Sequence, residues 1–269
     1  MKGLTTVLTL MLLLSLAGYL MAVDYYCVSG SCDNTLKFWY INNASCIRTI
    51  TGHTNDVNAV LITPDDLNVF SGSSDNTVKY WSLRTGSLIR TFSGHTDAVT
   101  SLSMTNNMQN VVSGSEDGTI KVWNITTGAL VRTINQGQAV NALSIITNKQ
   151  NFVSAAFDDT LRLWNLDTGA CEYKFAGHTD ILMAAALSHN NQFALSGGRD
   201  NTVKLWDVQT GALLRTMQAG DWVSFLVFTK DGKYAVASLS TTGNNIKYWR
   251  MSDGALIRTF TGHSSGQHQ

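Results

Sequence analysis

The sequence predicts an all-β protein built from about six copies of one repeat of roughly 42 residues. Tryptophan recurs at nearly constant separations of 42, 42, 41, 42 and 43 residues. Most of these tryptophans end a phrase that begins with serine and carries an aspartate six residues before the tryptophan. Within each phrase apolar residues alternate with one basic residue, a period of two that indicates a strand. The phrases end at Trp39, Trp81, Trp123, Trp164, Trp206 and Trp249.

Each repeat is expected to hold four short strands in order. A first strand precedes the phrase, as over residues 57–62. A hairpin at Asp-Asn or Asp-Gly then leads into the strand that ends at tryptophan, because these residues tolerate the positive φ of tight turns. A second hairpin such as Thr85-Gly86 leads into a last strand, here over residues 88–92. Four short strands per unit, repeated about six times, make up the predicted fold.

Composition narrows the classes of partner. The chain has 269 residues, with 19 basic and 19 acidic side chains and a formal net charge of zero. This balance gives no electrostatic footprint for nucleic acid, so no nucleic-acid partner is expected. The recurrent lysines are spread one per repeat, and we expect them on solvated strand faces. They are Lys37, Lys79, Lys121, Lys204 and Lys247.

The N-terminal segment allows two interpretations. Residues 1–17 contain Lys2, an apolar run and Ser15-Leu16-Ala17, a pattern typical of a secretory signal peptide. Alternatively they belong to a degenerate first strand, because residues 15–21 lie one repeat upstream of residues 57–63. The apolar run is too short and too interrupted by polar residues to predict a membrane span. The chain is expected outside the cytoplasm if the segment is a signal, and otherwise within it.

The repeated phrase resembles the WD-repeat family over about residues 25–263. The shared pattern is Gly-His, a spacer, then Ser-x-x-x-Asp and a tryptophan six residues after the aspartate. The resemblance implies a β-propeller of about six four-stranded blades around a central channel. Residues 18–263 would form the propeller and residues 264–269 a short polar tail. Two arrangements stay open: a closed ring in which His263 supplies the partner that Asp33 lacks, or a fragment of a seven- or eight-bladed propeller.

Serine, histidine and aspartate recur together with Trp81, Trp123 and Trp206, and they are the ingredients of nucleophilic hydrolysis. Their repetition argues against catalysis, since a catalytic site needs one set. The resemblance implies instead a buried hydrogen-bond chain, or tetrad, in the second, third and fifth blades, and a substituted one in the fourth, where Gln136 stands at the histidine position. The tetrad residues are His53, Ser71, Asp75, Trp81, His95, Ser113, Asp117, Trp123, Gln136, Ser154, Asp158, Trp164, His178, Ser196, Asp200 and Trp206.

No catalytic residue, metal site or cofactor is predicted. Four cysteines are present, and a disulfide among Cys27, Cys32 and Cys46 stays open because it depends on export. No spacing of cysteine and histidine resembles a metal site.

The family resemblance places a variable set of loop residues on one narrow face, where binding specificity is usually carried. Acidic side chains with aromatic anchors favour a peptide that brings lysine or arginine. The predicted function is a non-catalytic protein-interaction scaffold; a secreted recognition module and, third, a propeller enzyme are the alternatives. The candidate partner-binding residues are Asp97, Glu116, Phe157, Asp180, Arg199, Asp221 and Trp222.

Overall fold

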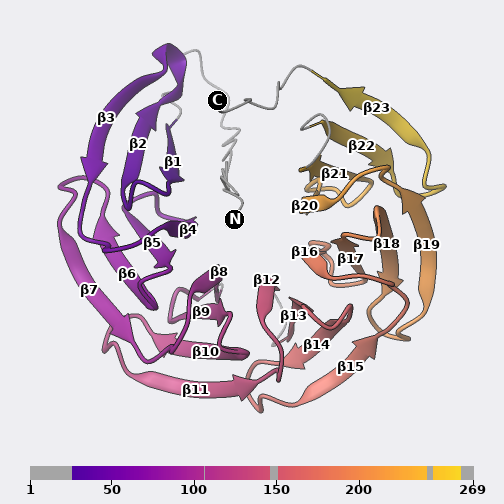
Figure 1. Ribbon diagram of the computed structural model, residues 1–269, viewed down its shortest axis with the longest axis horizontal. Helices are drawn as coiled ribbons and strands as arrows, with labels where there is room; N and C mark the ends of the chain where they lie inside the picture. The colour runs from indigo at the N-terminus through magenta and orange to yellow at the C-terminus, as the bar shows by residue number, and fades with distance from the viewer. Residues whose placement is uncertain (1–25, 106, 146–150, 241–244, 262–269) are drawn as a thin grey trace, which may run out of the picture.

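The computed structural model describes residues 26–105, 107–145, 151–240 and 245–261. In this part of the chain, the strands form six antiparallel sheets arranged around a common axis (Figure 1). The only helical element described is a short 3-10 turn, η1 (Ile41–Asn43). The predicted all-β propeller of about six blades is therefore confirmed.

Strands follow one another in sequence order within every sheet, so each blade is a simple meander from an inner to an outer strand. The first blade has three described strands, β1 (Tyr26–Gly30), β2 (Leu36–Tyr40) and β3 (Ser45–Ile50). The second and third blades are β4 (Val57–Ile62), β5 (Asn68–Ser73), β6 (Thr77–Ser82) and β7 (Leu88–Ser93), then β8 (Val99–Met104), β9 (Asn110–Ser115), β10 (Thr119–Asn124) and β11 (Leu130–Asn135).

The remaining blades repeat this plan. The fourth blade is β12 (Val140–Ile145), β13 (Asn151–Ala156), β14 (Leu161–Asn165) and β15 (Cys171–Phe175). The fifth is β16 (Leu182–Leu187), β17 (Phe193–Gly198), β18 (Thr202–Asp207) and β19 (Leu213–Gln218). The sixth is β20 (Val223–Phe228), β21 (Tyr234–Leu239), β22 (Ile246–Arg250) and β23 (Leu256–Phe260).

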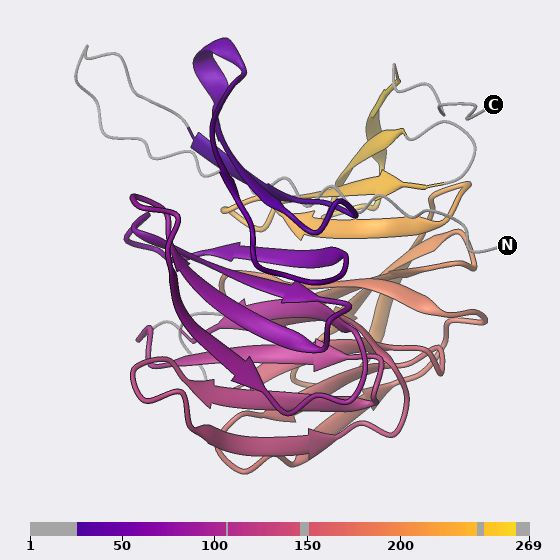
Figure 2. The ribbon, with the colours of Figure 1, turned by 60° about the vertical axis from the view of Figure 1, so that its left-hand side comes forward.

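The expected inner strand of the first blade, the proposed signal segment 1–17 and the tail 264–269 all lie outside the described residues. Figure 2 shows the β1–β3 sheet and the β20–β23 sheet, which are the two ends of the row of blades, on the same side of the molecule.

As the sequence predicts, residues with positive φ make the turn between the second and third strands in the first five blades, and the turn between the third and fourth strands in the second to sixth blades. Between the second and third strands, Asn76 has φ of 66° and Gly118 has φ of 77°. Between the third and fourth strands, Gly86 has φ of 73°. A β-branched residue at these positions would be strained, which is why asparagine, aspartate and glycine recur there.

The core lies between blades as well as within them. Trp81 of the second blade is buried in one cluster with Val28 and Ile50 of the first. Phe92 of the second blade contacts Trp123 of the third with a ring separation of 5.9 Å. The second to sixth blades therefore each bury their tryptophan against the blade before it, so these blades share their cores with a neighbour.

At the outer rim, arginines of one blade hold the Thr-Gly hairpin of the next. Arg90 donates to the carbonyls of Thr126 and Thr127, both at 2.9 Å. Arg48, Arg132 and Arg215 make the same kind of contact. The fourth blade has Tyr173 there instead, and its hydroxyl donates to the Thr210 carbonyl at 2.8 Å. These bonds fix neighbouring blades relative to each other.

Two of the five recurrent lysines are buried rather than solvated, which corrects the expectation from their spacing. Lys121 and Lys204 are buried, and their ammonium groups donate to Thr133 and Thr216 on the adjacent outer strand, each at 3.2 Å. Period-two alternation is typical of a sheet with one solvated face, but in a propeller both faces of a blade are covered by its neighbours.

Candidate binding face and the buried tetrads

Two kinds of connection meet at one end of the propeller, which we call the top face. The loops that join one blade to the next cover residues 51–56, 94–98, 136–139, 176–181 and 219–222, and the turns between second and third strands cover 31–35, 74–76, 116–118, 157–160 and 199–201. A backbone hydrogen bond ties turn to loop, as from Glu116 to Ala98 at 2.9 Å. The same bond recurs from Phe157 to Ala139 at 3.1 Å. The loops and turns therefore form one surface.

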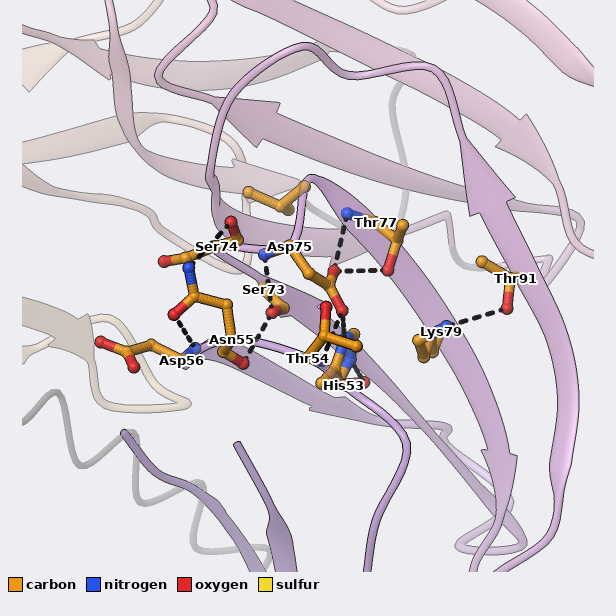
Figure 3. Close-up of polar contacts among 12 residues, drawn as sticks. His53, Thr54, Asn55, Asp56, Ser73, Ser74, Asp75, Thr77, Lys79 and Thr91 are labelled. Carbon is orange, nitrogen blue, oxygen red and sulfur yellow. Dashed lines mark hydrogen bonds and ion pairs between the residues drawn. The ribbon is translucent and has the colours of Figure 1, made fainter. Parts of the chain in front are cut away.

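In the second blade, the structure brings His53, Ser71, Asp75 and Trp81 into one hydrogen-bonded chain. His53 Nδ1 lies 2.6 Å from Asp75 Oδ2, and His53 Nε2 lies 2.7 Å from Ser71 Oγ. Trp81 Nε1 donates to the same Ser71 oxygen at 2.8 Å. Figure 3 shows Asp75 between His53 and Thr77. The backbone N–H and the hydroxyl of Thr77 donate to Asp75 Oδ1 at 3.0 and 2.6 Å. The chain links the inter-blade loop to the hairpin.

Protonation in this chain follows from burial. Burial lowers the pKa of His53, and the hydrogen bond that its ring donates to Asp75 offsets this only in part, so the imidazole is neutral at neutral pH. Because an ionised carboxylate only accepts, the single ring proton sits on Nδ1 and Nε2 accepts from the Ser71 hydroxyl. The serine oxygen then accepts from the indole of Trp81. Every polar atom of the chain has its partner.

The third and fifth blades repeat this geometry. Histidine-to-aspartate distances are 2.8 Å for His95 and Asp117 and 2.7 Å for His178 and Asp200. Burial raises the pKa of Asp117, but hydrogen bonds from Thr119, Thr96 and His95 outweigh it and lower the pKa to about 2. Indole-to-serine and histidine-to-serine bonds of 2.7 to 2.9 Å complete both sets, formed by His95, Ser113, Asp117 and Trp123, and by His178, Ser196, Asp200 and Trp206.

The serines of these sets are inaccessible to a substrate. Ser71, Ser113 and Ser196 each have 0% exposure, and each accepts a hydrogen bond from tryptophan. A nucleophile must reach a substrate atom and face oxyanion donors. Buried hydroxyls held in this way support a structural role for the tetrads.

The fourth blade has a shortened chain. Trp164 Nε1 donates to Ser154 at 2.7 Å, and Ser154 donates to Gln136 Oε1. The Gln136 Nε2 atom is buried and has no hydrogen-bond partner among the described residues. Asp158 bonds to Arg162 instead, with Nη2 to Oδ2 at 2.5 Å. Glutamine therefore keeps the bond to serine but not the bond to aspartate.

The terminal blades have no complete set among the described residues. In the first blade Trp39 donates to Ser29 at 2.8 Å, while Asp33 accepts from Thr35. In the sixth blade Ala219 and Ala237 occupy the histidine and serine positions, and Trp249 is buried. The expected contact between His263 and Asp33 falls outside the described residues.

Three of the seven candidate binding residues line one pocket on the top face. Asp97, Glu116 and Phe157 come from three different connections and border a pocket of about 410 Å³ between the third and fourth blades. Phe157 is 48% exposed. Burial raises the pKa of Glu116, and the negative charge of Asp97 raises it further. Asp97 and Glu116 thus repel each other beside one exposed aromatic ring, and the tetrad residue Asp117 also borders the pocket.

The other four candidates lie over the fifth and sixth blades, and the structure does not place them in this pocket. The Arg199 guanidinium lies 4.6 Å from the centre of the Trp222 ring. Asp180 is exposed, whereas Asp221 is buried and accepts from the Trp222 backbone at 2.7 Å. The arginine and the tryptophan, expected as separate contacts, therefore cover each other.

The pocket also includes residues that sequence reasoning did not select. Gly118, Gly137 and Asn141 border it. Gly118 has φ of 77° and Gly137 has φ of 85°, and the Gly118 carbonyl accepts backbone hydrogen bonds from Gly137 and Gln136. The signal was two departures from the repeat: Asp-Gly stands where the first, second and fifth blades have Asp-Asn, and Gln-Gly stands where the second, third and fifth blades have His-Thr. Each was visible alone, but only the fold brings them together.

The described part of the chain also bears on disulfides, metal sites and membrane spans. All four cysteines are free, with Cys27 buried and Cys32, Cys46 and Cys171 exposed. No three histidine, cysteine, aspartate or glutamate side chains among these residues come together as a metal site would require. Within the same residues, no helix has the length and apolar character to cross a membrane.

A ring of antiparallel blades, each with a tryptophan, and buried tetrads linking top-face loops define a repeat propeller. The family described as "WD domain, G-beta repeat" matches residues 44–82, 86–124, 128–165 and 169–207, which is more than half of the chain. The chain belongs to this WD-repeat family.

Two similar proteins match the chain over a segment about as long as one repeat. It is 54% identical over 39 residues to a guanine nucleotide-binding protein subunit beta of Zea mays, covering 14% of this chain and 10% of that protein. It is 42% identical over 40 residues to coatomer subunit beta'-2 of Arabidopsis thaliana, covering 15% of this chain and 4% of that protein. Each match spans a tenth or less of the relative.

Proposed function

We propose that the chain is a non-catalytic protein-interaction scaffold whose top-face pocket binds a lysine or arginine side chain of a peptide partner. The observation that carries the proposal is the pocket that joins Asp97, Glu116 and Phe157. WD-repeat propellers typically bind other proteins, and the buried serines of the tetrads leave no accessible nucleophile in them.

Electrostatics favour a cation in the pocket. Glu116 is desolvated and lies near Asp97, so its charged form is disfavoured. A bound lysine or arginine would stabilise both carboxylates and lower the pKa of Glu116. Phe157 offers an exposed ring, and a cation over an aromatic face gains about 0.5–1 kcal/mol at exposed sites.

The test uses short synthetic peptides with a central lysine or arginine and otherwise varied positions, read by fluorescence polarisation. We expect selected peptides to bind the wild-type protein, and to lose at least tenfold in affinity against D97N/E116Q/F157A. Replacement of the central cation by glutamine should have the same effect. Affinity should also fall as salt rises, because part of the attraction is between charges.

The matched control is D167N/E172Q, which removes two acidic charges from exposed positions away from the pocket. It should keep wild-type affinity. Equal loss in the pocket variant and the control would contradict the proposed site, and selection of peptides without a cation would contradict the proposed chemistry.

A further inference from the structure

One backbone N–H group at the border of the top-face pocket lacks the hydrogen bond that its equivalents make. In four of the five described loops between blades, an aspartate or asparagine side chain accepts from the N–H of the residue that follows it. These pairs, at 2.7 to 2.9 Å, are Asn55 and Asp56, Asp97 and Ala98, Asp180 and Ile181, and Asp221 and Trp222. The loop before the fourth blade has Gln138 and Ala139 there, and the Ala139 N–H has no hydrogen-bond partner among the described residues.

The residue type explains the missing bond. The short side chains of aspartate and asparagine fold back readily onto neighbouring backbone groups, whereas the exposed Gln138 side chain makes no such bond. The backbone does not prevent it, because the loop before the sixth blade has a similar conformation. Gly137 and Gly220 have φ of 85° and 76°, and both donate to a carbonyl in the turn of the preceding blade, at 3.2 and 3.3 Å. In the sixth-blade loop, aspartate still covers the N–H that follows it.

The open N–H lies beside the pocket in which we place the ligand. Gln138 and Ala139 both border this pocket of about 410 Å³, and Ala139 is half-buried. A backbone N–H in such a place needs an acceptor. The carboxylates of Asp97, Glu116 and Asp117 border the same pocket, so an anionic acceptor would be repelled. A neutral carbonyl oxygen is the acceptor that these charges favour.

We propose that the Ala139 N–H donates a hydrogen bond to a main-chain carbonyl of the peptide whose lysine or arginine occupies the pocket. The inference rests on the proposed function, because it places a peptide group beside the basic side chain that Asp97 and Glu116 bind. Main-chain hydrogen bonds contribute affinity in many complexes with extended peptides, while pockets select the side chains. The carboxylates thus select the side chain, and the N–H fixes how the peptide main chain lies across the pocket.

The first experiment measures affinity by fluorescence polarisation with the lysine or arginine peptides that the wild-type protein selects. Q138N supplies the side chain that Asn55 uses in the second blade, so it should cover the Ala139 N–H. We expect it to weaken binding about two- to tenfold, the range for one neutral hydrogen bond. Q138A is the matched control, since it removes the glutamine but offers no acceptor, and it should keep wild-type affinity. Equal affinities of Q138N and Q138A would overturn the proposal.

A change in the peptide tests the same hydrogen bond from the other side. One peptide bond at a time is replaced by an E-alkene, which keeps the shape of the main chain but has no carbonyl oxygen. At one position, the replacement should weaken binding to the wild-type protein about two- to tenfold and have little effect with Q138N, whose N–H is already covered. Equal effects in the two proteins at every position would overturn the proposal.

Nuclear magnetic resonance of protein labelled with ¹⁵N-alanine observes the N–H directly. A139S identifies the Ala139 signal by its loss. We expect this signal to move downfield, and its hydrogen exchange to slow, when a selected peptide saturates the protein. The Ala129 signal, from a hairpin at the opposite end of the propeller, should not change.

The outcomes separate this inference from the function on which it rests. An unchanged Ala139 signal at saturation would overturn the hydrogen bond, even where D97N/E116Q/F157A abolishes binding and so supports the pocket. Selected peptides whose affinity ignores D97N/E116Q/F157A would contradict the proposed function, and this inference with it.

Discussion

Arg162 holds both carboxylate oxygens of Asp158, with Nη1 to Oδ1 at 3.0 Å and Nη2 to Oδ2 at 2.5 Å. The three blades with complete tetrads carry lysine at this position and threonine opposite it, whereas the fourth blade has Lys174 opposite Arg162. Two basic side chains therefore surround the aspartate that a histidine contacts elsewhere. The fourth blade thus differs from the repeat at three related positions: glutamine replaces histidine, arginine replaces lysine and lysine replaces threonine.

Restoring all three residues should stabilise the protein. We expect Q136H/R162K/K174T to gain about 1 kcal/mol in the free energy of unfolding, because a buried amide nitrogen without a partner is replaced by a complete chain. Q136H alone should gain less, since Arg162 still occupies Asp158. Urea titration measures both variants. A triple variant no more stable than Q136H would contradict the coupling between these residues.

Loss of a tetrad serine should lower the free energy of unfolding, and the loss should be larger where the serine and its tryptophan are more deeply buried. S113A leaves the Trp123 indole and a His95 nitrogen unpaired in the core, and we expect a loss of about 1–3 kcal/mol. Its control is S29A, because Ser29 accepts the same indole bond at 2.8 Å from Trp39, which is only half-buried. Chemical denaturation should show a smaller loss there. Equal losses would mean that burial does not set the cost.

The tetrad histidines should make stability fall in weak acid. Burial lowers the pKa of His53, His95 and His178 below the usual 6.5, so the unfolded chain binds protons first as the pH falls. The free energy of unfolding should therefore be greatest above pH 6.5 and decrease below it, through the folded-state pKa values. Asp117 acts in the same direction between 3.8 and about 2.

Urea titrations from pH 8 to pH 5 would measure this effect. H95Q should show a shallower loss than the wild-type protein, and H189Q, at an exposed position, should keep the wild-type slope. An unchanged slope in H95Q would contradict the assignment of the neutral histidine.

The contact between Gly72 and Val99 of neighbouring blades should accept a larger residue on one side when the residue on the other side is made smaller. G72A puts a Cβ 2.6 Å from Val99 Cγ1, and we expect a loss of about 1–3 kcal/mol from overpacking. V99A in the same chain should recover part of it by removing the clashing methyl groups. Thermal unfolding of the two single variants and the double variant measures the coupling. No recovery would indicate that the backbone at Gly72, and not its side-chain space, limits the substitution.

Much of the fold could be predicted from local signals. Tryptophan spacing and strand periodicity depend on residues close in the chain, so repeats, hairpins and strands such as β4 follow from them. The environment of Lys121 could not be predicted, because a strand does not show that both of its faces are covered. The pairing of Arg199 with Trp222 was missed for a similar reason: the two residues belong to consecutive repeats, and only folding brings them together.

The sequence alone determined the repeat, its strands and turns, and the residues that enter each tetrad, since these are set by patterns within about 42 residues. The tertiary structure decided which of those residues meet. It joined Asp97, Glu116 and Phe157 in one pocket, left Gln136 without its aspartate, and exposed Phe225 at the last blade. Packing between blades decides such contacts, because the core lies between neighbouring blades as well as within them.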